Sequence, residues 1–67
     1  MEAHMYKIEA LQGNTVVYTE PGWGEDEAEA LRGVRLTLAH KGITFDGIRA
    51  SLAKNIYDAY GLAEKKR

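Results

Sequence analysis

The sequence predicts a small α+β domain in which an antiparallel β-hairpin packs on a two-helix hairpin, in the order ββαα. Two observations predict this fold class. Residues 6–19 carry the alternation and the turn residues of a hairpin, and the segments after residue 24 repeat apolar residues at helical spacing. The 67 residues are enough for one domain and no more.

The hairpin is predicted from two strand-like segments on either side of a turn. Residues 6–11 alternate apolar and polar side chains, and residues 15–19 are rich in β-branched and aromatic ones. Residues 12–14, Gln-Gly-Asn, have the composition of a turn. A three-residue loop would pair Ala10 with Val16. That register places five side chains on one face of the hairpin: Tyr6, Ile8, Ala10, Val16 and Tyr18.

Two helices are predicted after the hairpin. The first spans about residues 25–41, begins with acidic residues and stops at Gly42, and Gly33 within it suggests close packing against another element. The second spans about residues 45–60, with Thr44 as its N-cap. Each helix has one apolar stripe, formed by Ala28, Ala30, Leu31, Val34, Leu38 and Ala39 in the first and by Phe45, Ile48, Leu52, Ile56, Ala59 and Ala63 in the second.

Composition narrows the class of protein. The sequence has no cysteine, which excludes disulfides and thiolate metal sites and fits the cytoplasm, and no apolar run is long enough for a membrane span. We interpret residues 1–4, including His4, as a cloning remnant, residues 5–63 as the domain and residues 64–67 as a basic solvated tail. A domain this small has a marginal core, so a homodimer is expected.

No grouping of residues indicates catalysis, so the protein is expected not to be an enzyme and to need no cofactor or metal. Ser51 is the only serine, and His40 falls near the end of the first predicted helix, where a partly exposed histidine suits the helix dipole. The acidic run 25–29 lacks the spaced oxygen ligands of a calcium loop, because consecutive helical carboxylates point in different directions.

The segment around the single tryptophan is the candidate site for a partner. Trp23 lies between two glycines, just after Pro21, which is expected to end the second strand. Packing of the indole on the first helix is the favoured interpretation, and an exposed binding residue is the alternative. The predicted partner-binding surface joins Trp23 to the neighbouring acids Glu20, Glu25, Asp26, Glu27 and Glu29.

Apolar residues outside the predicted stripes favour an interface between copies of the chain. Leu36, Tyr57 and Val17 are the predicted oligomer-interface residues, because one hairpin and two helices cannot bury all of them.

Residues 42–52, Gly-Ile-Thr-Phe-Asp-Gly-Ile-Arg-Ala-Ser-Leu, carry a glycine, a capping threonine, an aliphatic residue and an arginine in the order of a helix–helix junction. This junction resembles the one in ribbon-helix-helix regulators. The resemblance covers about half of the chain and implies a dimer that binds DNA. Arg49, Lys54 and Arg35 are the candidate nucleic-acid contacts for that alternative.

The charge distribution and the lack of catalytic groupings predict a binding protein. Residues 1–30 hold seven acids and one lysine, whereas residues 31–67 hold eight basic and three acidic residues. The favoured function is a small regulator or inhibitor of phage or mobile-element type, which binds a basic or nucleic-acid-handling protein through its acidic surface. The alternative is a dimeric DNA-binding transcriptional regulator.

Overall fold

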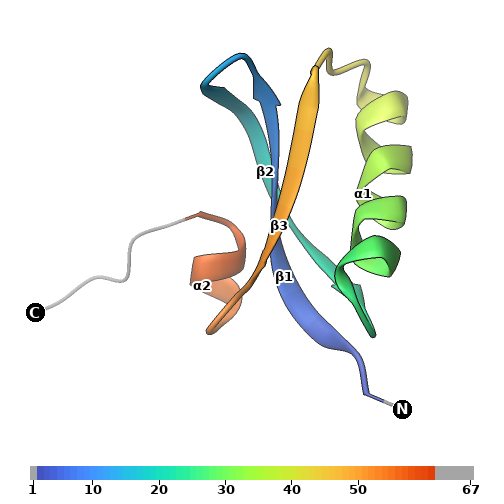
Figure 1. The fold of residues 1–67 in the computed structure, drawn as a ribbon, viewed down its shortest axis with the longest axis vertical. Coiled ribbons are helices and arrows are strands. Elements are labelled where there is room, and N and C mark those ends of the chain that lie inside the picture. Colours follow the sequence, from blue (N-terminus) through green and yellow to red (C-terminus); the bar gives the residue numbers. More distant parts are fainter. Residues whose placement is uncertain (1, 62–67) are drawn as a thin grey trace, which may run out of the picture.

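The computed structural model describes residues 2–61 as a three-stranded antiparallel sheet with one helix on each side (Figure 1). The strand order is β2-β1-β3, so the N-terminal strand is central. The α+β class and the N-terminal antiparallel hairpin are confirmed, but the two-helix hairpin is not formed. The elements in chain order are β1 (His4–Gln12), β2 (Thr15–Gly24), α1 (Glu27–Lys41), β3 (Gly47–Leu52) and α2 (Ile56–Ala59).

The hairpin has a tighter turn than the sequence predicted. Gln12 pairs with Thr15, so the loop is the two residues Gly13 and Asn14, and Gly13 has a φ of 61° that favours glycine. Ala10 pairs with Tyr18 rather than with Val16. The predicted register is therefore wrong by two residues. An irregularity next to Ala10 also moves Val16 onto the other face, opposite Leu11.

Strand β2 continues through Pro21 to Gly24, so the prediction that Pro21 ends the strand is wrong. The ladder explains why proline is tolerated there. Ala53 N–H donates to the Met5 carbonyl at 3.0 Å, so Met5 bonds on the β3 side of β1. Successive residues of a central antiparallel strand direct their backbone groups alternately to its two neighbours, so every second residue after Met5 also bonds on that side. Lys7, which pairs with Pro21, therefore directs its backbone groups toward β3. The nitrogen of Pro21 faces away from β1, and no ladder bond is lost.

Helix α1 confirms the first predicted helix. Asp26 is the N-cap, Gly42 closes the C-terminus with a φ of 70°, and the sheet-facing stripe buries Ala30, Val34 and Leu38. The expected close packing at Gly33 is wrong, because a side chain added there would meet no heavy atom within 4 Å.

The second predicted helix is wrong over most of its length. Residues 47–52 form strand β3, which pairs antiparallel with β1, and only Ile56–Ala59 are helical. Residues 42–52 therefore form a loop and a strand, and the helix pair implied by the resemblance to ribbon-helix-helix regulators does not exist. Thr44 caps no helix. The Asp46 carboxylate instead accepts hydrogen bonds from Gly13 N–H at 3.1 and 3.2 Å.

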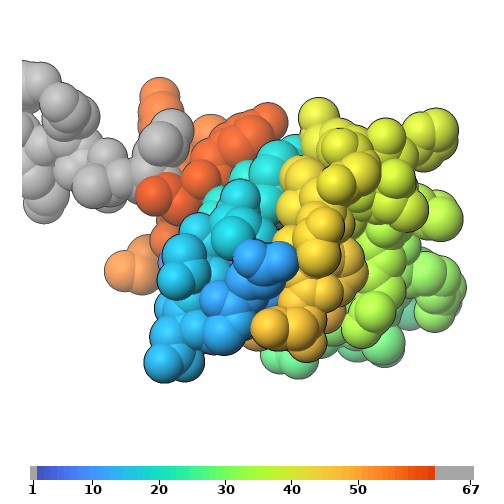
Figure 2. Space-filling view, turned by 90° about the horizontal axis from the view of Figure 1, so that it is seen from above, coloured from blue at the N-terminus to red at the C-terminus, as the bar shows by residue number. Residues whose placement is uncertain are grey.

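That contact joins the hairpin turn to the segment before β3. Figure 2 shows this end of the molecule, where the blue and cyan turn lies beside the yellow and orange residues that lead into β3. Asp46 N–H also donates to the Leu11 carbonyl at 2.9 Å. The start of β3 is thus fixed to β1 by backbone and side-chain bonds.

The core lies between α1 and one face of the sheet. Ile8 and Leu38 are its largest fully buried side chains. Tyr6, Ile8 and Ala10 of β1 meet Ala30, Val34 and Leu38 of α1, and Tyr18, Leu31, Ile43, Phe45, Ile48 and Ala50 pack around them. Helix α2 lies on the opposite face, against β1 and β2, where it buries Ala59 (Figure 1).

The predicted domain limits at residues 4, 63 and 64 are compared with the structure at the two ends of the chain. His4, which was assigned to a cloning remnant, is the first residue of β1, and its ring meets the edge of Tyr6 at a centroid distance of 6.5 Å. The expected basic tail 64–67 and the last residues of the predicted domain, 62–63, lie outside the described residues. Within residues 2–61, no helix has the length and apolar character needed to cross a membrane.

Candidate functional site

Trp23 is an exposed residue near the end of β2, with 58% of its surface accessible. The favoured interpretation of a packed anchor is therefore wrong, and the alternative placement on the surface is the observed one. The alternation of β2 explains this. Trp23 pairs with Met5, on the face of the sheet away from α1, whereas its neighbours Gly22 and Gly24 are on the α1 face.

The backbone on both sides of Trp23 is buried and tightly packed. A Cβ added at Gly22 would lie 2.8 Å from the Ile8 side chain, and one at Gly24 would lie 2.8 Å from the Ala30 backbone nitrogen. The two glycines thus bring β2 against β1 and the first turn of α1. Sequence reasoning did not assign them this role, although the Gly-Trp-Gly pattern carried the signal. The consequence is an exposed indole that projects from a closely packed segment of backbone.

Two of the neighbouring acids form the start of α1. The Asp26 carboxylate accepts a hydrogen bond from Glu29 N–H at 3.0 Å, and the Glu29 carboxylate accepts one from Glu25 N–H at 2.6 Å. This is a variant of the reciprocal capping arrangement. The backbone that carries Glu25 and Glu27 is therefore fixed, and both side chains are exposed beyond it.

Glu20 is separate from this group. It pairs with Ile8, so its side chain is on the α1 face of the sheet, opposite to that of Trp23. Its carboxylate accepts a 2.6 Å hydrogen bond from the Tyr18 hydroxyl. That bond, together with partial burial and the carboxylate charge, raises the pKa of Tyr18 to about 12. We name the group of Trp23, Glu25, Asp26, Glu27 and Glu29 the Trp23 surface, without Glu20.

The three residues predicted as an oligomer interface lie on three separate parts of the molecule. Leu36 is 68% exposed on α1, Tyr57 is exposed on α2 on the other side of the sheet, and Val17 lies on β2 beside the irregularity of the hairpin. One flat contact cannot include all three. The expectation of a homodimer itself stays a prediction.

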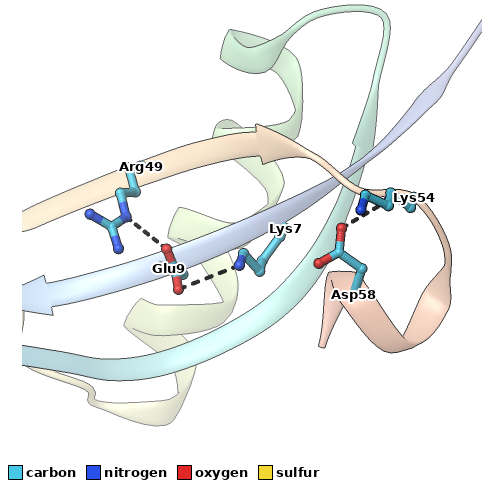
Figure 3. A network of polar contacts seen from close by, with 5 residues as sticks. All are labelled: Lys7, Glu9, Arg49, Lys54 and Asp58. Atoms are coloured by element: carbon cyan, nitrogen blue, oxygen red, sulfur yellow. Dashed lines mark hydrogen bonds and ion pairs between the residues drawn. The ribbon is translucent and has the colours of Figure 1, made fainter. Parts of the chain in front are cut away.

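The candidate nucleic-acid contacts are also dispersed. Arg49 of β3 donates from Nε to the Glu9 carboxylate at 2.7 Å, and Lys7 lies 4.0 Å from the other oxygen of that carboxylate (Figure 3). Lys54 precedes α2 and donates its backbone N–H to Asp58. Arg35 is on α1, across the sheet from α2. Sequence reasoning missed Glu9, whose carboxylate pairs with the guanidinium of Arg49.

The residues weighed for catalysis are not combined into a site. His40 is exposed in the last turn of α1, and Ser51 is exposed on β3. Within residues 2–61, no group of three or more histidine and acidic side chains has a geometry that would hold a metal ion. The chain matches no protein-family model, and no curated protein or solved structure is significantly similar to it.

Proposed function

We propose that this protein is a non-enzymatic binding module that recognises a basic segment of another protein through the Trp23 surface. The observations that carry the proposal are the exposure of the only tryptophan, the closely packed backbone on both sides of it, and the exposed acids that follow it in the chain. Regulation or inhibition of the bound protein is the biological role that such a module would have.

The indole supplies the apolar part of the contact. Tryptophan is enriched among the few residues that dominate protein interfaces, because it buries a large area at a small cost in side-chain entropy. The packed backbone at Gly22 and Gly24 lowers that cost further, since the support needs no ordering when a partner binds. Loss of an interface tryptophan typically weakens binding by about 2 kcal/mol or more, which is roughly 30-fold.

The acids supply the preference for a basic partner. Residues 20–29 contain five acidic residues and no lysine or arginine. Exposed carboxylates at Glu25 and Glu27 would attract lysine or arginine side chains, and the indole face offers a cation–π contact to the same groups. Both effects weaken with added salt, because the acids are exposed to solvent.

The sole tryptophan also provides the assay. Its emission reports on the Trp23 surface alone, so synthetic peptides of about 12 residues with mixed basic and apolar composition can be titrated and followed by fluorescence. We expect saturable changes for basic peptides that weaken with salt and with the double variant E25Q/E27Q. Absence of any change across basic, neutral and acidic peptides would contradict the proposal.

A capture experiment completes the test. Proteins retained from the native host by the wild-type chain should be lost with Trp23→Ala and kept with Leu36→Ala, which truncates another exposed apolar residue, on the outer surface of α1. Retention that is unaffected by Trp23→Ala would refute the site. A gel shift with duplex DNA that disappears on neutralising Arg49 and Lys54 would support DNA binding instead.

A further inference from the structure

The two edges of the sheet differ in how they are protected against pairing with another strand. An edge strand presents unpaired backbone N–H and C=O groups, and proteins block such edges with proline, charges and bulges. Edge strand β2 has all three devices, in Pro21, Glu20 and the irregularity near Val17. Edge strand β3 has no proline and no bulge, and its single charge lies on Arg49.

Arg49 does not protect the edge. Its guanidinium extends over the sheet face toward Glu9 of the central strand, at 2.7 Å, rather than outward (Figure 3). Among the described residues, β3 pairs only with β1. Within residues 2–61, no strand pairs with its outer side, and no loop donates a backbone hydrogen bond to it.

The ladder identifies which backbone groups are available. Because Ala53 bonds to Met5, the alternate residues Ser51 and Arg49 also direct their N–H and C=O groups to β1. Ile48, Ala50 and Leu52 direct theirs outward. On β2 the residues that direct their backbone groups outward are Thr19, Pro21 and Trp23. Because proline has no N–H, the middle one of these three cannot donate a hydrogen bond.

We infer that the outer edge of β3 pairs antiparallel with β3 of a second copy of this chain, which joins two three-stranded sheets into one of six strands. This interaction surface is distinct from the Trp23 surface, which lies on and beyond the opposite edge strand. The inference therefore goes beyond the proposed function.

The sequence of β3 is self-complementary in one register. With Ala50 opposite its equivalent, Ile48 lies opposite Leu52 of the second copy, and three residue pairs exchange two hydrogen bonds each. Arg49 then lies opposite Ser51. A register centred on Arg49 would place two guanidinium groups directly opposite each other, which is destabilising, and it would use fewer of the outward groups.

The same register covers apolar surface that the single copy exposes. Leu52 is 67% exposed although it is on the α1 face of the sheet, opposite Tyr6. On this face of β3, Ile48 and Ala50 are partly buried against the core, so Leu52 at the end of the strand is the exposed apolar side chain. Contact with Ile48 of the second copy would cover Leu52 and continue the apolar row of the sheet.

The size of the contact sets its strength. Six strand residues span about 20 Å, which makes a contact smaller than the roughly 1,200 Å² of stable interfaces. We therefore expect a reversible dimer that is half dissociated at about 100 µM, and not a permanent one. The exchange between copies should be fast.

The experiment uses the full chain at concentrations from about 10 µM to about 1 mM, the range where so small a contact changes its occupancy. Sedimentation velocity measures association, and hydrogen exchange followed by NMR measures protection of single amides. We expect the amides of Ile48, Ala50 and Leu52 to gain protection as concentration rises. The outward amides of Thr19 and Trp23 should not change.

Proline supplies a matched pair of variants. Ala50→Pro removes a central outward donor of β3 without removing a bond to β1, as Pro21 does on β2. It should weaken association at least ten-fold. Thr19→Pro makes the same change on the other edge and should leave association unchanged. Leu52→Lys, at an exposed position, gives a second disruption that does not depend on proline.

Two results would overturn the inference. One is a monomer at about 1 mM, ten times the expected midpoint. The other is an association that survives both Ala50→Pro and Leu52→Lys in folded protein, or that protects the amides of β2 instead of those of β3. Protection of β3 amides only on addition of a foreign peptide would also reject self-pairing and assign the edge to another occupant.

Discussion

Two glycines on either side of the start of α1 should respond to the same substitution in opposite directions. Gly33 lies in the interior of α1, and a Cβ added there has no heavy atom within 4 Å. Gly24 lies at the end of β2, where an added Cβ would be 2.8 Å from the Ala30 nitrogen and from the Glu29 side chain. The methyl group of an alanine therefore fits without contact at position 33 but collides with the backbone of α1 at position 24.

The magnitudes follow from these surroundings. Gly33→Ala should raise the free energy of unfolding by about 1 kcal/mol, because alanine loses less backbone entropy in a helix than glycine. Gly24→Ala should lower it by about 1–3 kcal/mol, since β2 and α1 must separate to admit the methyl group. For a domain of this size, 1 kcal/mol corresponds to a shift in Tm of about 4–8 °C.

Urea denaturation followed by far-UV circular dichroism measures both changes. The m-value should stay constant, which shows that the variants change stability and not the extent of unfolding. Stabilisation by Gly24→Ala would refute the reasoning, because it would mean that β2 and α1 are not in contact there. Destabilisation by Gly33→Ala would show that the outer surface of α1 is covered in solution.

Three further predictions concern the core, the helix cap and the tyrosine. Leu38→Ala should lower the free energy of unfolding by about 2–5 kcal/mol, which is enough to unfold a large fraction of the molecules of so small a domain. Thermal denaturation measures this loss. Asp26→Ala should cost about 1 kcal/mol through loss of the N-cap, whereas Asp26→Asn should cost much less, since asparagine caps equally well. Tyr18 should titrate near pH 12 in absorbance at high pH, and Glu20→Gln should lower that pKa toward 10.

The raised pKa of Tyr18 has a consequence for stability. The folded state holds the neutral phenol more strongly than the unfolded chain does, so the stabilisation is complete below about pH 10. It is lost as the pH rises from about 10 to about 12. The loss should be smaller in Glu20→Gln. Equal loss in both proteins would show that the bond to Glu20 does not hold the phenol proton.

Local signals were sufficient for α1 and for the hairpin. The Asp26 side chain accepts a hydrogen bond at the N-terminus of α1, and the Gly42 backbone N–H donates one at its C-terminus, so a few neighbouring residues determine each end. The hairpin has its turn glycine and its alternation within a short segment. The predicted register was wrong by one residue at the turn, which has two residues and not three, and by one more at Ala10, where an irregularity inserts a residue that no alternation pattern reveals.

Spacing was ambiguous for the residues after Gly42. Ile48, Leu52 and Ile56 recur every four residues, which fits a helix of 3.6 residues per turn and also a strand of period two. The alternation of Ile48, Ala50 and Leu52 with Arg49 and Ser51 was the signal for the strand. A distant element decided between them, because pairing with β1 occurs only when the chain folds back.

The candidate site divides in the same way. The sequence by itself determined that one tryptophan stands between glycines, next to a run of acids, and that α1 begins there. Only the tertiary structure decided that the indole is exposed and that the Glu20 side chain is on the other face of the sheet. The reason is that the residue of β1 with which each residue of β2 pairs determines the face on which its side chain lies. That pairing joins residues far apart in the sequence, so it is not a local property of the chain.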